Sequence, residues 1–351
     1  MRAIHIITDM QFGSTGKGLF AGFLAEDMGI DTVITAWGPN AGHTYVDANG
    51  RKFVHTMLAN GIVGSRVRNV LIGPGSVINL TDLRAEMEAA KDVIEKNRIT
   101  IFIHSAAAIV TEEHRLAEKQ YGFAIGSTMK GTAEAMIQKL RRRPGEPNTA
   151  GQLLKDDPFW GPMVLSPEEW DGYLESDVKN VMIEGAQGYS LSLNHGFYPY
   201  TTSRDCTTAQ LLVDCAIPFK YIRSAMPMVW GVCRTYPIRV ANRFDPVTGE
   251  QIGTSGPCYR DQKEIDWEQI GVEPELTTVT KLVRRVFTLS MLQLSSAAEV
   301  NGINGIFLNF ANYVNPDGLP KLVERIEHAT RCPVIYVGHG PRVTDVHQWR
   351  K

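Results

Sequence analysis

Apolar and polar positions in the first part of the chain follow strand-like and helix-like patterns in turn. Residues 3–8 form a short apolar run that predicts a buried strand, and apolar residues at helical spacing follow until Gly29. Asn49-Gly50 separates two short strand-like segments and predicts a hairpin. Further strands are expected at 32–37, 101–104, 181–183, 226–232, 306–310 and 334–337, and helices at 80–94 and 278–298. This alternation predicts an α/β fold whose mainly parallel central sheet is flanked by helices.

The domain organisation follows from length and composition. A chain of 351 residues has room for one large domain or two medium ones. The best linker candidate is the Pro- and Gly-containing stretch 143–148, but no shift in composition accompanies it. We therefore expect a single domain over residues 1–351 with long functional loops.

Charge and cysteine usage exclude several classes of protein. Lys and Arg number 36 and Asp and Glu 38, so the formal net charge is -2 and no nucleic-acid partner is expected. No apolar run reaches the roughly 18 residues of a membrane span, so no membrane partner is expected. The 5 cysteines are scattered without a CxxC pair, which predicts neither disulfides nor a zinc site. The N-terminus starts directly as a strand-like run, and we expect a cytoplasmic protein.

The glycine-rich segment Gly13-Ser14-Thr15-Gly16-Lys17-Gly18 lies between a predicted strand and a predicted helix. Its glycines allow backbone N–H groups to turn towards an anion, the helix N-terminus attracts negative charge, and Lys17 adds a point charge. It differs from a Walker A motif, which requires a glycine in place of Gln11 and Ser or Thr in place of Gly18. The segment therefore predicts a P-loop-like phosphate-binding loop, with a plain tight connection as the alternative.

A second loop, residues 38–44, follows the next predicted strand. In an open parallel sheet it reaches the same ligand-binding edge as the first loop. An isolated loop histidine has no special role in most proteins. Flanked by Asn40 and Gly42 at this edge, His43 is a candidate for stabilising charge during phosphoryl transfer.

Three more blocks complete a pattern: EGAQG at 184–188, HGFYPYTTS at 195–203 and GHGP at 338–341. With the two loops they resemble adenylosuccinate synthetase, and the match runs in order over nearly the whole chain. In that family a nucleoside triphosphate phosphorylates the 6-oxygen of a purine nucleotide, and the aspartate amine then displaces the phosphate. The resemblance implies a C–N ligase that uses Mg²⁺.

Site residues carry over by motif position. The resemblance implies catalytic roles for Ser14, Lys17, His43 and Gln187, and magnesium binding by Ser14 and the Gly42 carbonyl. It implies that the triphosphate is bound by Ser14, Thr15, Gly16, Lys17, Gly18, Gly42, His43, Thr44, Gln187, Asn309, Gly338, Gly340 and Pro341. The acceptor nucleotide would be bound by Ser14, Asn40, Ser127, Thr128, Arg142, Gln187 and Thr202, and aspartate by Gly253, Thr254, Ser255 and Arg260.

Arg142 matches an arginine that the family donates across a homodimer interface. The alternative for the run 141–143 is a solvated helix end, because basic residues suit a helix C-terminus.

The chain departs from the family first at Ser14, where the family has an aspartate that takes the proton from ring nitrogen 1 and binds Mg²⁺. A serine hydroxyl is not basic at neutral pH, so Ser14 cannot inherit both roles. An inactive enzyme is one interpretation. Against it, Lys17, Gly42, His43 and Gln187 are all retained.

Two further departures concern the other ligands. Ala311 replaces an aspartate that pairs with the guanine of GTP, and unpaired guanine donors would cost roughly 1–3 kcal/mol each, which favours ATP or dATP. In the loop 253–260, opposite an arginine-rich loop of the family, only Arg260 survives of the arginines. One missing arginine reaches the ribose side of the nucleotide, so a 2'-deoxyribose substrate would tolerate its loss.

Together the departures resemble a phage-encoded branch of the family, the 2-aminoadenylosuccinate synthetases, which act on dGMP in the pathway to 2-aminoadenine-containing DNA. A small hydroxyl at Ser14 leaves room beside the 2-amino group of guanine. The resemblance implies dGMP, L-aspartate and ATP or dATP as ligands, and the host cytoplasm as the location. Two alternatives stay open: an ordinary adenylosuccinate synthetase acting on IMP with GTP, and an inert nucleotide-binding homologue.

Overall fold

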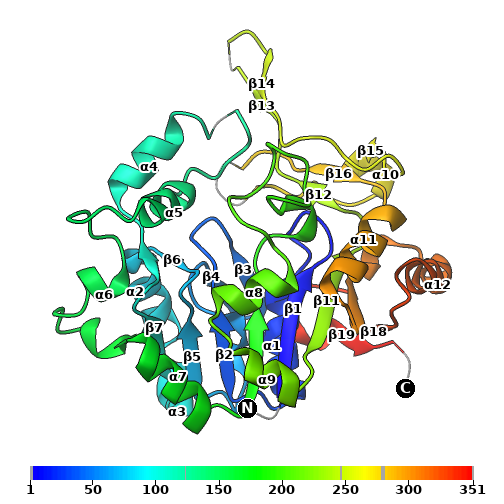
Figure 1. The fold of residues 1–351 in the computed structure, drawn as a ribbon. Helices are drawn as coiled ribbons and strands as arrows, with labels where there is room; N and C mark the ends of the chain where they lie inside the picture. Colours follow the sequence, from blue (N-terminus) through cyan, green and yellow to red (C-terminus); the bar gives the residue numbers. More distant parts are fainter. Residues whose placement is uncertain (1–2, 123, 246, 278–280, 350–351) are drawn as a thin grey trace.

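The structure, a computed structural model, describes residues 3–122, 124–245, 247–277 and 281–349. A ten-stranded sheet forms its centre (Figure 1). Every neighbouring pair of strands in it is parallel except β18 with β19, which lies at one edge of the sheet. In spatial order the strands are β19 (Val346–Gln348), β18 (Val334–Gly338), β17 (Gly305–Asn309), β11 (Met228–Arg234), β1 (Ala3–Asp9), β10 (Asn180–Glu184), β2 (Thr32–Thr35), β5 (Asn69–Ile72), β7 (Thr100–His104) and β9 (Val164–Leu165).

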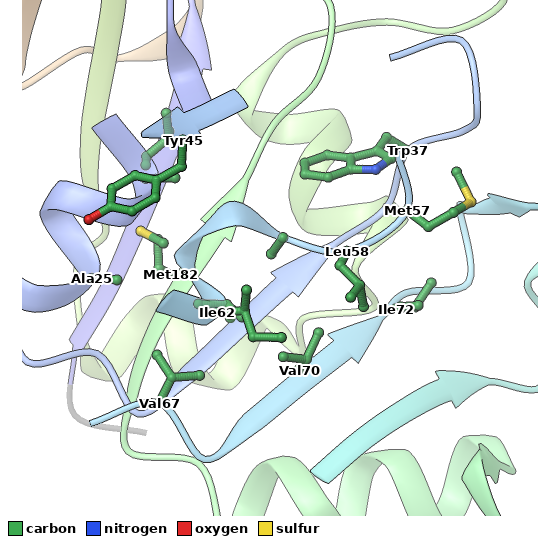
Figure 2. Close-up of a cluster of buried hydrophobic side chains, with 14 of the residues drawn as sticks. Ala25, Trp37, Tyr45, Met57, Leu58, Ile62, Val67, Val70, Ile72 and Met182 are labelled. Atoms are coloured by element: carbon green, nitrogen blue, oxygen red, sulfur yellow. The ribbon is translucent and has the colours of Figure 1, made fainter. Parts of the chain in front are cut away.

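The sheet separates two hydrophobic clusters because successive side chains of a strand point to opposite faces. In β10, Met182 belongs to the first cluster, whereas Val181 and Ile183 belong to the second. Figure 2 shows part of the first cluster, where Met182 lies close to Ala25 and Ile62. Both faces of the sheet are therefore covered, as parallel sheets require.

The helices divide between these faces. On the first cluster pack α1 (Lys17–Asp27), α2 (Leu80–Ala89), α3 (Lys91–Asn97) and α6 (Ala150–Leu153). On the second pack α7 (Pro167–Ser176), α8 (Thr208–Asp214), α9 (Phe219–Ser224), α11 (Met291–Asn301) and α12 (Leu319–Thr330). Among the described residues, no helix has the length and apolar character needed to cross a membrane.

Smaller units lie above the carboxyl ends of the strands. They are the hairpins β3 (His43–Val46) with β4 (Lys52–His55) and β13 (Arg243–Phe244) with β14 (Gln251–Gly253), the pair β6 (Val77–Ile78) with β8 (Ala108–Ile109), and the sheet of β12 (Ile238–Arg239), β16 (Arg285–Phe287) and β15 (Glu264–Ile265). Helices α4 (Glu112–Lys119), α5 (Thr132–Arg141) and α10 (Trp267–Ile270) complete them. The β13–β14 hairpin projects from the rest of the molecule (Figure 1).

The predicted α/β class, the parallel sheet and the first hairpin are confirmed. The predicted helix over 278–298 is confirmed over 291–298, within α11, and wrong before that: residues 285–287 form β16, and α11 begins only after Ser290, whose hydroxyl accepts the Gln293 N–H at 2.9 Å. Residues 278–280 of that prediction lie outside the described part. The predicted helix at 80–94 is interrupted at Ala90, and the buried strand β5 was not predicted. The single domain stays a prediction, consistent with a sheet that draws strands from both ends of the chain.

Candidate active site

The loop between β1 and α1 has the backbone of an anion cradle. Gly13, Ser14 and Gly16 have positive φ angles of 85°, 55° and 93°, which is uncommon for a non-glycine residue such as Ser14. Gly18 is required by close approach, since a Cβ there would lie 2.9 Å from the backbone of Thr44 in β3. This contact explains why the Ser or Thr of a Walker A motif is absent at this position.

Lys17 is held inside the loop by a residue that the sequence did not single out. Its Nζ donates to Asp9 Oδ2 at 2.8 Å and to the Gln187 carbonyl at 2.7 Å, and both members of the ion pair are buried. Asp9 also accepts the Gln11 N–H at 2.8 Å and the Thr15 hydroxyl. An ammonium has three donors, so one remains for a phosphate oxygen.

Gln187 and Asn40, both predicted to bind the acceptor nucleotide, lie in contact. Gln187 follows β10 with a φ of 54°, and its Nε2 donates to Asn40 Oδ1 at 3.2 Å. The next residue, Gly188, is packed so closely that a Cβ would lie 2.6 Å from the Asp9 carboxylate. The EGAQG block thereby forms one wall of the phosphate loop.

His43 is oriented by Glu184, the last residue of β10. The His43 Nδ1 lies 2.8 Å from Glu184 Oε1, and the carboxylate also accepts the Asn60 N–H at 2.8 Å. Its ring is 4.5 Å from that of Trp37, centroid to centroid. A proton on Nδ1 bonded to the carboxylate leaves Nε2 as the nitrogen available to a ligand. Nearby, burial lowers the pKa of His55 to about 4, so this neighbour is neutral at physiological pH.

The predicted triphosphate residues near the end of the chain meet the first loop through Asn309. Its Nδ2 donates to the Thr15 carbonyl at 3.0 Å, and a Cβ on Gly16 would overlap the same amide. Gly338 packs against Asn309. Ala311 follows and is buried.

The last two predicted triphosphate residues lie in the loop that follows β18. Gly340 lies beside Asp345, and Pro341 is exposed.

The predicted dGMP and aspartate loops lie side by side. The Thr254 N–H donates to the Ala124 carbonyl at 3.3 Å, which joins the loop of Gly253, Thr254 and Ser255 to that of Ser127 and Thr128. The Ser127 hydroxyl donates to Glu118 Oε1 at 2.6 Å. The Ser255 hydroxyl accepts from Arg285 Nη1 at 2.9 Å.

Aromatic contacts connect these loops to the phosphate loop. Phe12 stacks on Phe197 with ring centroids 6.5 Å apart, and Arg239 lies 4.4 Å above the Phe12 ring. The block that contains Phe197 also positions Thr202, whose N–H donates to the Leu191 carbonyl at 2.8 Å. Burial lowers the pKa of Arg239 to about 9.

Two predicted residues do not join the site within one chain. Arg142 is exposed just beyond α5, where its Nε donates to the Leu140 carbonyl at 3.3 Å. Arg260 is exposed in a turn and, within the described part of the chain, has no hydrogen-bond or ion-pair partner.

Sequence reasoning missed Asp9, Glu184, Arg234 and Arg239, which are all buried. Asp9, Glu184 and Arg234 each end a strand of the central sheet, and Arg239 ends the short strand β12. A charged residue one or two positions after a predicted buried strand is the signal that was available for the first three.

An anion-binding loop at the carboxyl edge of a parallel sheet, next to a buried lysine, places this chain among the α/β proteins that bind phosphorylated nucleotides. The family model described as adenylosuccinate synthetase matches residues 6–159 and 171–316. The chain belongs to the adenylosuccinate synthetase family.

Phage proteins are among its most similar relatives. It is 46% identical to the N6-succino-2-amino-2'-deoxyadenylate synthase of Salmonella phage PMBT28, over 97% of this chain and 96% of the relative. It is 44% identical to the protein of the same name from Vibrio phage phiVC8, over 99% and 98%.

Among solved structures, the chain is similar to the succinoaminodeoxyadenylate synthetase of cyanophage S-2L, which is bound to dGMP and to dATP as an energy donor. The TM-score is 0.89 and the identity 42%, over 99% of this chain and 95% of that one. The fully ligated adenylosuccinate synthetase of Plasmodium falciparum shares the fold, with a TM-score of 0.77 at 18% identity and complete coverage of both chains.

Proposed function

We propose that this protein joins L-aspartate to the 6 position of dGMP with ATP or dATP as phosphoryl donor, giving 2-amino-2'-deoxy-N6-succinyladenylate for the synthesis of 2-aminoadenine DNA. The observation that carries the proposal is the similarity, along almost the entire chain, to phage proteins named for that product. The serine at position 14, in a left-handed backbone conformation within the loop, supplies the physical reason for a guanine acceptor.

The reaction has two steps. In the first, the 6-oxygen of the base bonds to the γ-phosphorus, the bond to the β-phosphate oxygen breaks, and the proton on ring nitrogen 1 leaves through Ser14 to solvent or a phosphate oxygen. In the second, the aspartate amine bonds to carbon 6, inorganic phosphate departs with the 6-oxygen, and the nitrogen loses a proton to solvent.

The residues of the sheet edge supply positioning and charge, which account for most of the acceleration of phosphoryl transfer. Lys17 neutralises charge on the triphosphate, and His43, held by Glu184, stabilises the transferring group. Gln187 and Asn40 hold the acceptor nucleotide. Ser14 shapes the pocket beside the 2-amino group and is not required to be a strong base.

The proposed cofactor is Mg²⁺. Among the described residues, no group of three or more His, Cys, Asp or Glu side chains is arranged to hold a metal ion. The Asp9 carboxylate is already used by Lys17 and Thr15. Mg²⁺ is often bound through few protein oxygens and the substrate phosphates, and the space beside Gly42 is open. The Ser14 hydroxyl and the Gly42 carbonyl fit that mode, and the ion would neutralise phosphate charge there.

We further propose that the active form is a homodimer in which Arg142 binds the dGMP of the partner subunit, and that the protein works in the host cytoplasm. The Arg142 side chain is exposed and donates to the Leu140 carbonyl of its own helix end, which supports the assignment in trans.

The test is a matrix of reactions. Purified protein is incubated with L-aspartate and Mg²⁺, with dGMP, GMP or IMP as acceptor and ATP, dATP or GTP as donor. Phosphate release and the succino-adduct are measured. We expect adduct from dGMP with ATP or dATP. Turnover only with IMP and GTP would identify an ordinary adenylosuccinate synthetase, and no phosphate release in any mixture would identify an inert homologue.

A further inference from the structure

Arg234 is a fully buried charged side chain beside the phosphate loop that the proposed reaction does not use. It ends β11, next to β1, and its side chain is 0% exposed. Gln11 holds its main chain from both sides: the Arg234 N–H donates to Gln11 Oε1 at 3.0 Å, and Gln11 Nε2 donates to the Arg234 carbonyl at 3.0 Å. The position of the guanidinium is therefore fixed by the sheet.

The guanidinium contacts three separate segments. Its Nη1 donates to the Ser14 carbonyl at 3.1 Å and to Glu275 Oε2 at 3.2 Å, and its Nη2 donates to Glu275 Oε1. The Arg234 Cζ lies 3.8 Å from the centroid of the ring of Phe310, a residue of the turn that leads to Ala311. Arginine alone combines a planar fork for a carboxylate with a flat face for an aromatic ring.

Both loop residues that Arg234 contacts have strained backbones. Ser14 has a φ of 55° and Phe310 a φ of 59°, and such conformations persist only where surrounding contacts enforce them. The Phe310 carbonyl is also held by the Thr235 hydroxyl, at 2.8 Å. Arg234 thus holds Ser14, a residue of the proposed acceptor pocket. Together with Thr235 it also holds the turn at Phe310, which belongs to the proposed pocket for the base of the donor nucleotide.

Glu275 completes the constellation from a third segment. It also accepts the Tyr313 hydroxyl at 3.1 Å, and its carbonyl accepts the Arg284 N–H at 2.9 Å. The ion pair therefore connects the phosphate loop, the start of the segment that leads to β16 and the turn after β17.

We propose that Arg234, fixed by Glu275, is a positioning residue that fixes Ser14 relative to the Phe310–Ala311 turn. The 6-oxygen of the acceptor base is thereby aligned with the γ-phosphate of the donor. This inference rests on the proposed function and names residues that set its geometry. Loss of the arrangement would lower the rate more than it lowers nucleotide binding, because misplacement of reacting groups by about 1 Å costs up to 10²-fold in rate.

The first variant is Arg234→Lys, which keeps the charge and loses the fork and the flat face. We expect kcat with dGMP to fall about 10- to 100-fold, with KM for dGMP and for the donor changed much less. The matched control is Arg51→Lys, since Arg51 also pairs with a carboxylate, Asp92, at 2.5 and 2.8 Å and lies 4.4 Å above the Phe53 ring, but on the surface. The control should keep the parent kcat. An unchanged kcat in Arg234→Lys would overturn the proposal.

A second variant separates positioning from stability. The double variant Arg234→Met, Glu275→Leu replaces the ion pair with apolar side chains, an exchange that often leaves stability unchanged or improved. We expect a Tm near that of the parent and a kcat still reduced at least about tenfold. Recovery of the parent kcat together with its Tm would show a purely structural role and overturn the proposal.

Amide hydrogen exchange tests Arg234 without turnover. In Arg234→Lys, the amides of residues 13–16 should exchange at least about tenfold faster than in the parent and in Arg51→Lys. Equal exchange would refute the positioning role. If the parent makes no adduct and this difference is still seen, the proposed function fails while the role of Arg234 in the loop stands.

Discussion

The sheet edge and the loops that face it hold their charged residues in different ways. At the edge, Lys17 and Asp9 form an ion pair whose side chains are 3% and 0% exposed, and Glu184 beside His43 is also fully buried. In the facing loops, Arg142 and Arg260 are exposed and Ser127 and Thr254 are only partly buried, although Ser255 is buried. Each charged residue of the sheet edge is held by several hydrogen-bond or ion-pair partners, whereas the residues of the facing loops have fewer partners.

This difference in burial predicts that substitutions in the two regions have different effects on stability and activity. A buried ion pair that loses one member leaves an uncompensated charge, so substitutions at the edge should reduce stability and activity together. Exposed loop side chains contribute little to stability, so substitutions there should change substrate binding alone. We therefore expect the phosphate site to be the more rigid part, and the proposed recognition of dGMP and aspartate to depend on the more exposed loops.

The largest contrast is expected between Lys17→Met and Arg260→Met. Lys17→Met leaves Asp9 buried without its cation and should lower the free energy of unfolding by about 3–5 kcal/mol and abolish adduct formation. Arg260→Met should change stability by less than about 0.5 kcal/mol and raise only the KM for aspartate. Urea unfolding and steady-state kinetics measure both. Equal losses of stability would contradict the comparison.

Ser14, within the edge loop, should affect chemistry without a large effect on folding, because its side chain is exposed. Ser14→Ala should lower kcat by about one to two orders of magnitude, within or below the range of a true general base. Ser14→Asp should lose turnover of dGMP and gain some with IMP, because a carboxylate crowds the 2-amino group. If Ser14→Asp uses dGMP as well as the parent does, acceptor choice lies elsewhere.

Arg142 tests whether a loop residue works across the dimer. Arg142→Ala should raise the KM for dGMP about 10- to 100-fold, since a hydrogen bond to a charged group contributes roughly 1.5–3 kcal/mol. Mixing it with inactive His43→Ala should recover part of the activity in heterodimers. No recovery would mean that Arg142 acts in its own chain or has no role in binding.

Ala311 tests the donor pocket. Ala311→Asp should shift preference from ATP towards GTP, because the carboxylate accepts two guanine donors that otherwise stay unpaired, at roughly 1–3 kcal/mol each. Asn309 is a second determinant to change if the shift is small, since its amide is committed to the Thr15 carbonyl. Competing turnover of the two donors provides the measurement, and GTP turnover by the parent equal to ATP turnover would refute the assignment.

Titration of His55 should change the stability of the fold at acidic pH and leave turnover at neutral pH unaffected. Burial lowers its folded pKa to about 4, whereas the unfolded value is about 6.5, so the unfolded state binds the extra proton between these pH values. Stability should therefore fall with decreasing pH through this window, by about 2 kcal/mol from pH 7 to pH 5. His55→Gln should flatten that dependence in urea unfolding and leave turnover at neutral pH unchanged. A parallel pH profile in the variant would contradict the assignment to His55.

Local patterns in the sequence predicted much of the architecture. Short apolar runs and helical spacings located most strands of the sheet and α1, and the order of strands and helices indicated the parallel class. The predictions were wrong where one pattern covered two elements, as in the helix expected over 278–298, because apolar runs in β16 and α11 differ in period over too few residues to separate.

The sequence by itself determined the phosphate loop, since glycine spacing and a following helix are local properties of the chain. Only the tertiary structure decided which charged groups complete the site: Glu184 lies 141 residues from His43, and Arg234 lies 220 residues from Ser14. Such pairs depend on the order of β11, β1, β10 and β2 in the sheet, which local periodicity does not specify. The burial of Asp9 and Arg234 is a tertiary property that the sequence does not show. It strengthens their hydrogen bonds, because a low dielectric strengthens contacts between charges.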